Sequence, residues 1–380
     1  MNRIFVTFAA LCLMAVSVHA ETKSKKSTTL PIVGEVVKAN NPMIQYMGRV
    51  TFAGNPEHAR FNFPGTTIFA RFTGTSLKMV CRPMTGYFMA QVDGCEPFKV
   101  GFNAERDSVV NIAAALQPGQ HDVKLMYVME GLFRQPEFHA LVLDKGATIV
   151  QPQPLPERKI EFIGNSITCG YGVESIEKTD PFEDETENHM LTYANIVSDS
   201  LHAQHTSISR SGIGMYRNYN GPTKGNADNM PWQYEYTLFN DHSEQWDFSR
   251  YQPQLVCINL GTNDLSTPGY DLKLYEKNYR SFLALVRNKY PQAKIVLLTG
   301  TMLGEKQNAE QQEVLNRICR DVNKKGTDGK TKQGDKEVYR FDMTPQTGSL
   351  GYGASWHPSK LQHEKMAAEL LPFLKNLMKW

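Results

Sequence analysis

The sequence has 380 residues, which is enough for two domains with a buried core in each. Its hydrophobic content of 41%, its charged content of 21% and its formal net charge of +2 are ordinary for a globular protein. Lys and Arg are scattered, and no basic stripe interleaves with aromatic residues, so the composition argues against a nucleic-acid or membrane-surface partner.

Residues 1–20 have the pattern of a secretory signal peptide. A short positive start is followed by an almost unbroken apolar run over residues 4–18, and Val18-His19-Ala20 resembles a small-residue cleavage site. The apolar run is short for a membrane span. Leu11 precedes Cys12 at a place where a bacterial lipoprotein signal has a small residue. We therefore expect a soluble exported protein, secreted or periplasmic, without a lipid anchor.

The cysteines after residue 20 do not form the pattern of a disulfide framework. They are odd in number and irregularly spaced, at Cys81, Cys95, Cys169, Cys257 and Cys319. A single bridge between Cys81 and Cys95 is compatible with an oxidising compartment, and the alternative is that all are free thiols. No CxxC or HExxH motif occurs. The sequence therefore predicts no structural metal and indicates no cofactor.

Residues 21–150 are expected to form an all-β sandwich. Apolar and polar residues alternate over short stretches, and turn sequences such as Thr73-Gly74-Thr75 separate them. No long helical period interrupts this pattern, which is typical of a sandwich. The clearest alternating stretches are 67–72, 77–81 and 121–128.

A second domain is expected after a proline-rich linker at residues 151–157. Three prolines alternate with other residues there, which makes a stiff and extended connector. In residues 158–380 strands alternate with helices, and this order predicts an α/β domain with a parallel sheet. The expected strands are 160–163, 206–208, 255–260, 294–299 and 338–341, and the expected helices are 190–201, 270–289, 305–325 and 360–377.

Reactive side chains follow the strands of this second domain. Ser166 comes after the first strand, Gly212 after the second and Asn263 after the third, while His357 stands just before the last helix. Ligands of parallel sheets bind beyond the carboxyl ends of the strands, so these residues are expected to lie close together.

Together these residues have the chemistry needed for acyl transfer. A serine hydroxyl becomes a nucleophile when a base removes its proton, and histidine is the usual base near neutral pH. The tetrahedral intermediate needs donors for its oxyanion. The backbone N–H groups of Ser166 and Gly212 and the side-chain amide of Asn263 can supply them.

Four short blocks of the sequence resemble those of the SGNH, or GDSL-type, hydrolases and occur in the same order. The blocks are Gly164-Asn165-Ser166-Ile167-Thr168, Gly212, Gly261-Thr262-Asn263-Asp264 and His357-Pro358. The resemblance implies a three-layer α/β/α sandwich with a parallel sheet. It also implies that Ser166 is the nucleophile, that His357 is the base, and that Ser166 N–H, Gly212 and Asn263 form the oxyanion hole.

A narrower resemblance, to carbohydrate esterase family 2, covers nearly the whole chain after residue 20. It is carried by the stretch GNSITCGYG, by Thr186-Glu187-Asn188 and by the preceding β region, because members of that family have a small jelly-roll domain before the SGNH domain. The family removes O-acetyl groups from plant polysaccharides and sugars without a metal. The resemblance thus implies an exported serine esterase acting on acetylated polysaccharides or oligosaccharides, such as xylan or glucomannan.

Two alternative functions remain open at this point. One is a lipase or thioesterase of the same fold that acts on longer acyl chains. The other is a carbohydrate-binding protein that keeps the fold without catalysis, although the four intact blocks argue against it.

The sequence departs from the family pattern beside the histidine. SGNH enzymes usually carry an Asp two or three residues before it, and Ser355 and Ala354 occupy those places here. We therefore predict a Ser166–His357 dyad in which a main-chain carbonyl of residues 354–356 accepts the Nδ1–H of His357. The alternative is that Asp264 or Asp342 supplies an acid from elsewhere.

Other positions are open to more than one interpretation. Asn165 stands where the family usually has Asp, and a structural role is expected for it. Gly214 competes with Gly212 as the oxyanion donor. The acidic segment 174–187 is expected to be a solvated loop near the rim of the cleft. The three candidates for contact with a sugar substrate are Trp356, Trp232 and Tyr171, because a flat aromatic ring packs well against the C–H face of a sugar. The alternative role for these side chains is ordinary packing.

Overall fold

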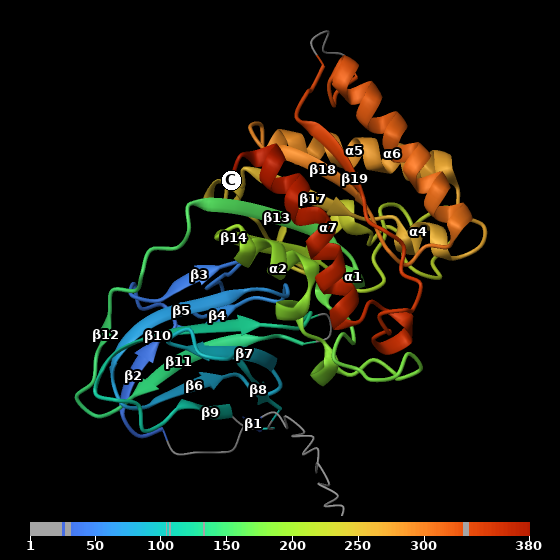
Figure 1. Ribbon diagram of the computed structural model, residues 1–380. Helices are drawn as coiled ribbons and strands as arrows, with labels where there is room; N and C mark the ends of the chain where they lie inside the picture. The colour runs from blue at the N-terminus through green and yellow to red at the C-terminus, as the bar shows by residue number, and fades with distance from the viewer. Residues whose placement is uncertain (1–24, 27–31, 104, 106–107, 132–133, 330–333) are drawn as a thin grey trace, which may run out of the picture.

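Figure 1 shows the computed structural model, in which an all-β part lies at the lower left and an α/β part at the upper right. The predicted signal peptide lies outside the described residues. No helix in the described part of the chain is both long and apolar enough to cross a membrane. The structure describes residues 25–26, 32–103, 105, 108–131, 134–329 and 334–380.

Two sheets form the predicted β-sandwich. One has the strand order β1-β8-β7-β10-β5-β12 with β3 beside β5, and the other has the order β2-β11-β6-β9 with β4 beside β11. The strands are β1 (Lys25–Lys26), β2 (Glu35–Lys38), β3 (Gln45–Met47), β4 (Ala59–Arg60), β5 (Thr67–Gly74), β6 (Leu77–Cys81), β7 (Gly86–Val92), β8 (Phe98–Phe102), β9 (Ser108–Ala113), β10 (Gly119–Tyr127), β11 (Glu137–Leu143) and β12 (Ile149–Val150).

The alternation that predicted these strands corresponds to their two faces. On β5, Ile68, Ala70 and Phe72 are buried, whereas Phe69 and Arg71 between them keep part of their surface in solvent. Successive side chains of a strand point to opposite faces, so one face joins the core and the other does not.

Cys81 is buried and Cys95 is exposed, and both are free thiols, so the bridge considered between them is not formed.

Five parallel strands form the sheet of the α/β part, in the order β14-β13-β17-β18-β19. Helices α2 and α7 cover one face and α5 and α6 the other, which confirms the predicted three layers (Figure 1). The elements are β13 (Arg158–Gly164), α1 (Ser166–Cys169), α2 (Tyr193–Ser200), β14 (Ala203–Ser209), α3 (Met230–Gln233), β15 (Tyr236–Leu238), β16 (Asp241–Gln245), β17 (Leu255–Asn259), α4 (Thr262–Ser266), α5 (Leu272–Lys289), β18 (Lys294–Thr299), α6 (Glu305–Lys325), β19 (Val338–Asp342) and α7 (Lys360–Met378).

Polar caps set helix boundaries that the hydrophobic pattern did not place. The predicted helix 190–201 is divided, because Thr192 ends a short 3₁₀ turn, His189–Leu191, and accepts the N–H of Asn195 to begin α2. Helix α5 begins two residues later than predicted, since the carboxylate of Asp271 caps its first turn.

Arg49 joins the two parts of the molecule. It follows β3, and its Nη1 donates to the carbonyl oxygens of Tyr234 and Tyr236 at 2.6 and 2.7 Å. Its guanidinium also lies 3.9 Å from the carboxylate of Glu161 on β13, and both side chains are 1% exposed. A buried charge without a partner is costly, so this pair ties the sandwich to the parallel sheet.

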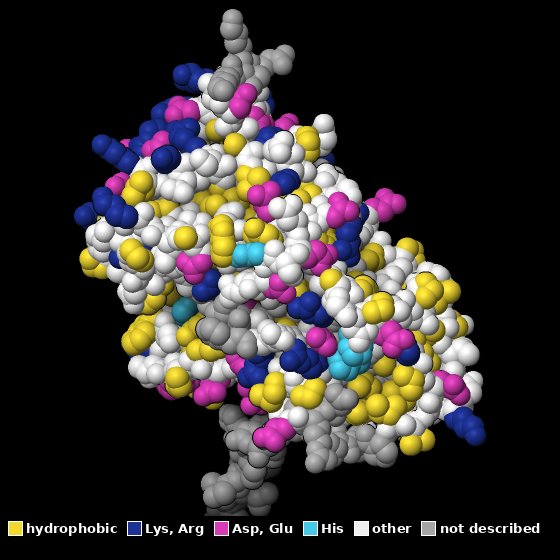
Figure 2. Space-filling view, turned by 180° about the vertical axis from the view of Figure 1, so that it is seen from behind, with side chains coloured by type: hydrophobic (Ala, Val, Ile, Leu, Met, Phe, Trp, Pro, Cys, Tyr) yellow, Lys and Arg dark blue, Asp and Glu magenta, His cyan; other side chains and the backbone are white. Residues whose placement is uncertain are grey.

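Charged side chains of both signs mix at the end of the molecule that α5 and α6 occupy, at the top of Figure 2. Ion pairs link the two helices there, such as those of Glu276 with Arg317 and of Arg280 with Asp321.

Candidate active site

Ser166 lies at a tight corner where β13 ends and α1 begins. Asn165 caps α1, because its Oδ1 accepts the N–H of Ile167 at 3.1 Å, which agrees with the structural role expected for it. A Cβ at Gly164 would lie 2.1 Å from Oγ1 of Thr168, so the corner has room only for glycine there. Ser166 itself is 6% exposed.

His357 contacts Ser166 with one ring nitrogen and a carbonyl with the other. Its Nε2 lies 2.9 Å from Oγ of Ser166, and its Nδ1 lies 3.0 Å from the carbonyl oxygen of Ala354. A carbonyl oxygen can only accept, so Nδ1 carries the proton and Nε2 of the neutral ring accepts from the serine hydroxyl. This is the arrangement of a hydrogen-bonded nucleophile and base.

The turn that carries the carbonyl has an unusual backbone. Ser355 has φ 49° and ψ 43°, and Trp356 has φ 59°, so two consecutive non-glycine residues are left-handed. This conformation costs roughly 1–2 kcal/mol per residue. Hydrogen bonds on both sides hold it, including Ala354 N–H to the carbonyl of Gly172 at 3.0 Å and the side chain of Gln346 to the carbonyl of Trp356 at 2.7 Å. The strained turn orients the oxygen that fixes His357.

Burial lowers the pKa of His357 to about 4, although the carbonyl oxygen of Ala354 favours the charged ring. The Tyr171 ring stacks on the imidazole with 4.1 Å between centroids, and Phe182 stacks on Tyr171 at 4.4 Å. The histidine is therefore neutral at pH 7 and able to accept a proton. Phe182 comes from the segment predicted to be a solvated loop, and no sequence pattern had singled it out.

Neither aspartate considered as an acid contacts His357. The carboxylate of Asp264 accepts the N–H groups of Met215, Tyr216 and Arg217 at 2.7 to 3.0 Å. Its pKa is raised to about 6 by burial, against the effect of these hydrogen bonds. Asp342 pairs with Arg340 instead. Asp264 thus holds the loop after β14, and the carbonyl of Ala354 is the partner of His357.

Three donors for an oxyanion come from neighbouring strand ends. In the hydrogen bonds of the described residues, the N–H groups of Ser166 and Gly212 have no protein acceptor. Asn263 donates one amide hydrogen to the carbonyl of Ile213 at 2.7 Å, which leaves the other free. The N–H of Gly214 already donates to Oδ1 of Asn218 at 3.0 Å. These bonds favour Gly212 over Gly214 as the oxyanion donor.

The aromatic candidates occupy different places. Trp356, 51% exposed, precedes His357 directly, and Tyr171 covers the histidine ring. Trp232 is 45% exposed and lies on α3, where its ring meets His242 edge-on with 3.7 Å between centroids. The ring contacts of Trp232 are with the β15–β16 hairpin rather than with another predicted site residue.

Two clusters of described residues bring three groups of metal-ligand type together. In the first, one carboxylate oxygen of Glu137 lies 3.5 Å from His58 and 3.3 Å from His139. The other carboxylate oxygen of Glu137 pairs with Arg60 and Arg82. The side-chain amide of Asn55 hydrogen-bonds Nδ1 of His58. Protein groups therefore already satisfy that cluster. The second consists of Glu130, Cys169 and Glu187, is buried, and lies between the two parts of the molecule.

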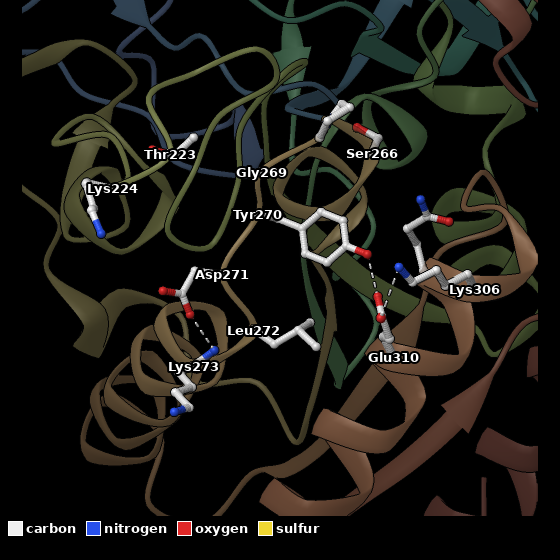
Figure 3. A pocket seen from close by; sticks show the side chains of 12 residues that line it. Thr223, Lys224, Ser266, Gly269, Tyr270, Asp271, Leu272, Lys273, Lys306 and Glu310 are labelled. Atoms are coloured by element: carbon white, nitrogen blue, oxygen red, sulfur yellow. Dashed lines mark hydrogen bonds and ion pairs between the residues drawn. The ribbon is translucent and has the colours of Figure 1, made fainter.

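A hollow of about 990 Å³ lies between the loop after α4, the start of α5 and the start of α6 (Figure 3). The ring of Tyr270 projects into it and donates to Glu310 at 2.5 Å, and Lys273 and Lys306 lie on its rim. None of the predicted site residues lines this hollow. The contact between Ser166 and His357, and not the size of a hollow, marks the candidate reactive centre.

Family models match both parts of the chain. Residues 46–154 match the model described as carbohydrate esterase 2 N-terminal, and residues 160–370 match GDSL-like lipase/acylhydrolase.

Curated relatives cover most of the chain. The cellulase/esterase CelE of Acetivibrio thermocellus is 34% identical over 345 residues, which are 90% of this chain. The chain spans only 40% of that relative's length. An acetylxylan esterase / glucomannan deacetylase of Cellvibrio japonicus is 28% identical over 363 residues, with 94% of both chains covered.

Solved structures are similar over nearly the same length. A family two carbohydrate esterase from Clostridium thermocellum, in complex with cellohexaose, has a TM-score of 0.80 and 33% identity and covers 89% of this chain and 99% of its own. One from Cellvibrio japonicus has a TM-score of 0.81 and 26% identity and covers 91% and 98%.

Proposed function

Because this chain belongs to the family two carbohydrate esterases, which carry a GDSL-like acylhydrolase domain, we propose that it removes O-acetyl groups from plant polysaccharides such as xylan or glucomannan. The observation that carries the proposal is the 2.9 Å contact between Nε2 of His357 and Oγ of Ser166. The names of the Cellvibrio japonicus relatives and the cellohexaose bound by the Clostridium thermocellum structure support a carbohydrate ester as substrate.

The reaction begins when Oγ of Ser166 attacks the acetyl carbonyl carbon while Nε2 of His357 takes the serine proton. The carbonyl electrons move to the oxygen, and the N–H groups of Ser166 and Gly212 and the amide of Asn263 donate to it. When the intermediate collapses, the C–O bond to the sugar breaks and His357 returns its proton to the sugar oxygen. Water, deprotonated by the same histidine, then attacks the acetyl carbon, and acetate leaves as His357 returns the proton to Oγ of Ser166.

The carbonyl of Ala354 does part of the work that an aspartate does in a triad. It holds the Nδ1–H proton and so keeps the tautomer in which Nε2 accepts. It brings no full negative charge, and the imidazolium that forms during the reaction is stabilised less than beside a carboxylate. The low pKa of His357 favours rapid return of the proton to the leaving sugar oxygen.

Export and domain organisation are further parts of the proposal. The pattern of residues 1–20 supports a cleaved signal peptide and a secreted or periplasmic location. The proposed division is a β-sandwich domain at 21–150, a linker at 151–157 and a catalytic domain at 158–380. An acetylated polysaccharide chain is the proposed partner, with Trp356 and Tyr171 beside the reactive groups.

Acetate release from acetylated xylan and acetylated glucomannan tests the function directly. We expect release from at least one polymer and faster hydrolysis of 4-nitrophenyl acetate than of 4-nitrophenyl butyrate. A preference for butyrate or longer esters would instead favour a lipase or thioesterase. Binding of the polymers without hydrolysis of any ester would favour a non-catalytic carbohydrate-binding role.

The Asn263→Ala variant is expected to lower kcat for 4-nitrophenyl acetate about 10²- to 10³-fold with little change in KM, because an oxyanion donor acts mainly in the transition state. Steady-state kinetics would measure this. The matched control is Asn218→Ala, which removes a hydrogen bond to Gly214 in the same loop but no proposed donor. Equal losses of kcat in both variants would mean that loop disturbance, and not a lost donor, explains the effect.

A further inference from the structure

Glu130 reaches from the β-sandwich into the α/β part beside the proposed oxyanion hole. It follows β10, is 8% exposed, and its Oε2 accepts the backbone N–H of Ser211 at 2.7 Å. Its own backbone N–H donates to Oε2 of Glu187 at 3.0 Å. The thiol of Cys169, at the end of α1, lies 3.9 Å from the same carboxylate oxygen. One carboxylate thus contacts the segments that carry Ser166 and Gly212.

The segment it contacts is the oxyanion loop, residues 210–214. Gly212 has φ +76°, and a Cβ there would have no neighbour within 4 Å, so no side-chain packing defines its orientation. Backbone bonds must do so instead. On one side the carbonyl of Gly212 accepts the N–H of Tyr219 at 2.8 Å, and on the other Ser211 N–H donates to Glu130. A hydrogen bond to a carboxylate is stronger than one to a neutral acceptor.

The charges around Glu130 indicate that a contribution to folding stability alone does not explain why a carboxyl group is buried at this position. Burial raises the pKa of Glu130 and of Glu187, and the nearby Glu130 carboxyl raises the pKa of Glu187 further. Apolar side chains would join the two parts of the molecule at a lower cost than two adjacent buried carboxyl groups. Other titratable groups near them are Arg210, Asp184, Cys169, Lys99 and Tyr127. Glu187 is itself buried, so the expectation of a solvated loop was wrong for this residue.

We infer that Glu130 is a positioning residue, through which the β-sandwich orients the oxyanion loop so that Gly212 N–H points at the developing oxyanion. This deepens the proposed function and rests on it for what the loop does in catalysis. The sandwich then supports the reactive centre directly and is more than a neighbouring glycan-binding module.

Glu130→Ala is expected to lower kcat for 4-nitrophenyl acetate about 10- to 100-fold with KM unchanged, because a misdirected donor weakens transition-state binding rather than substrate binding. Glu130→Gln keeps an acceptor oxygen at the same reach and is expected to recover most of kcat. A merely structural carboxylate would not produce this combination of a kcat loss, a constant KM and rescue by Gln.

Arg60→Ala is the matched control, since it breaks another contact between the two parts, the 3.0 Å bond from Arg60 to Asp241. Its kcat is expected to equal that of the wild type. Wild-type kcat in Glu130→Ala, or an equal loss in Arg60→Ala, would overturn the inference. If Glu130→Ala does not fold, Glu130→Asp takes its place, because the shorter side chain cannot keep a 2.7 Å bond to Ser211 N–H.

Hydrogen exchange gives a second readout that does not depend on the substrate. The amides of the peptide spanning residues 203–216 are expected to exchange faster in Glu130→Ala than in the wild type and in Arg60→Ala. Unchanged exchange would refute the positioning role. If the wild type hydrolyses no acetyl ester, the proposed function fails, but this measurement still decides whether Glu130 holds the loop.

Discussion

Ser166→Ala is expected to lower kcat for acetate release from acetylated xylan by about 10⁴-fold or more, because loss of a serine nucleophile removes the covalent route. The oxyanion donors would remain and would leave a small residual rate above that of water. Acetate assay on the polymer and absorbance assay on 4-nitrophenyl acetate would measure the loss. Circular dichroism would show that the variant is folded.

The control for this variant is Ser200→Ala, which changes an exposed serine on α2 and is expected to keep wild-type activity. Retention of more than a few per cent of activity in Ser166→Ala would contradict the assignment of the nucleophile. Cys169 does not offer a substitute, because its thiol is buried and its pKa is raised well above the usual value.

His357→Ala is expected to lower kcat by about 10⁴-fold or more, comparable to the loss in Ser166→Ala, because the two side chains act as one unit. The double variant Ser166→Ala/His357→Ala should therefore be no slower than either single variant. Kinetics of the three variants on 4-nitrophenyl acetate would measure this. Additive losses in the double variant would show that the two residues act independently and would contradict the dyad.

The matched control is His363→Gln. His363 is buried on α7, six residues after His357, and its Nδ1 accepts the N–H of Tyr193 at 3.3 Å. An effect on folding stability is expected there, but kcat of the folded fraction should change little. A loss equal to that of His357→Ala would point to a shared structural effect instead of a base.

The pH dependence of the wild type reports on the same histidine. His357 must be neutral to accept the serine proton, and burial lowers its pKa to about 4. As the pH falls, kcat/KM should therefore stay level to about pH 5 and then decrease about tenfold per pH unit below pH 4. An inflection near pH 6.5, the ordinary pKa of histidine, would show that the ring is not desolvated in this way. Circular dichroism at each pH separates this effect from unfolding.

The fold class followed from the sequence by itself, and so did the proposal of four candidate reactive positions. A largely apolar run such as 255–260 predicts a strand buried on both faces, which the structure has as Leu255–Asn259. The alternating strands and helices predict a parallel sheet. Because parallel strands end at one edge, the residues after them, Ser166, Gly212 and Asn263, were expected to meet His357. Local patterns were sufficient here, since the chemistry lies directly at the ends of elements that those patterns define.

Only the tertiary structure decided what surrounds these groups. Residue type does not signal that Ser355 and Trp356 adopt positive φ, yet this turn brings the Ala354 oxygen to His357. Likewise, Glu130 and Ser211 are 81 positions apart, and no periodicity relates a strand end of the sandwich to a loop of the parallel sheet. Such contacts depend on loop conformation and on how two separately formed cores pack, and these are determined by the whole chain rather than by any local stretch of it.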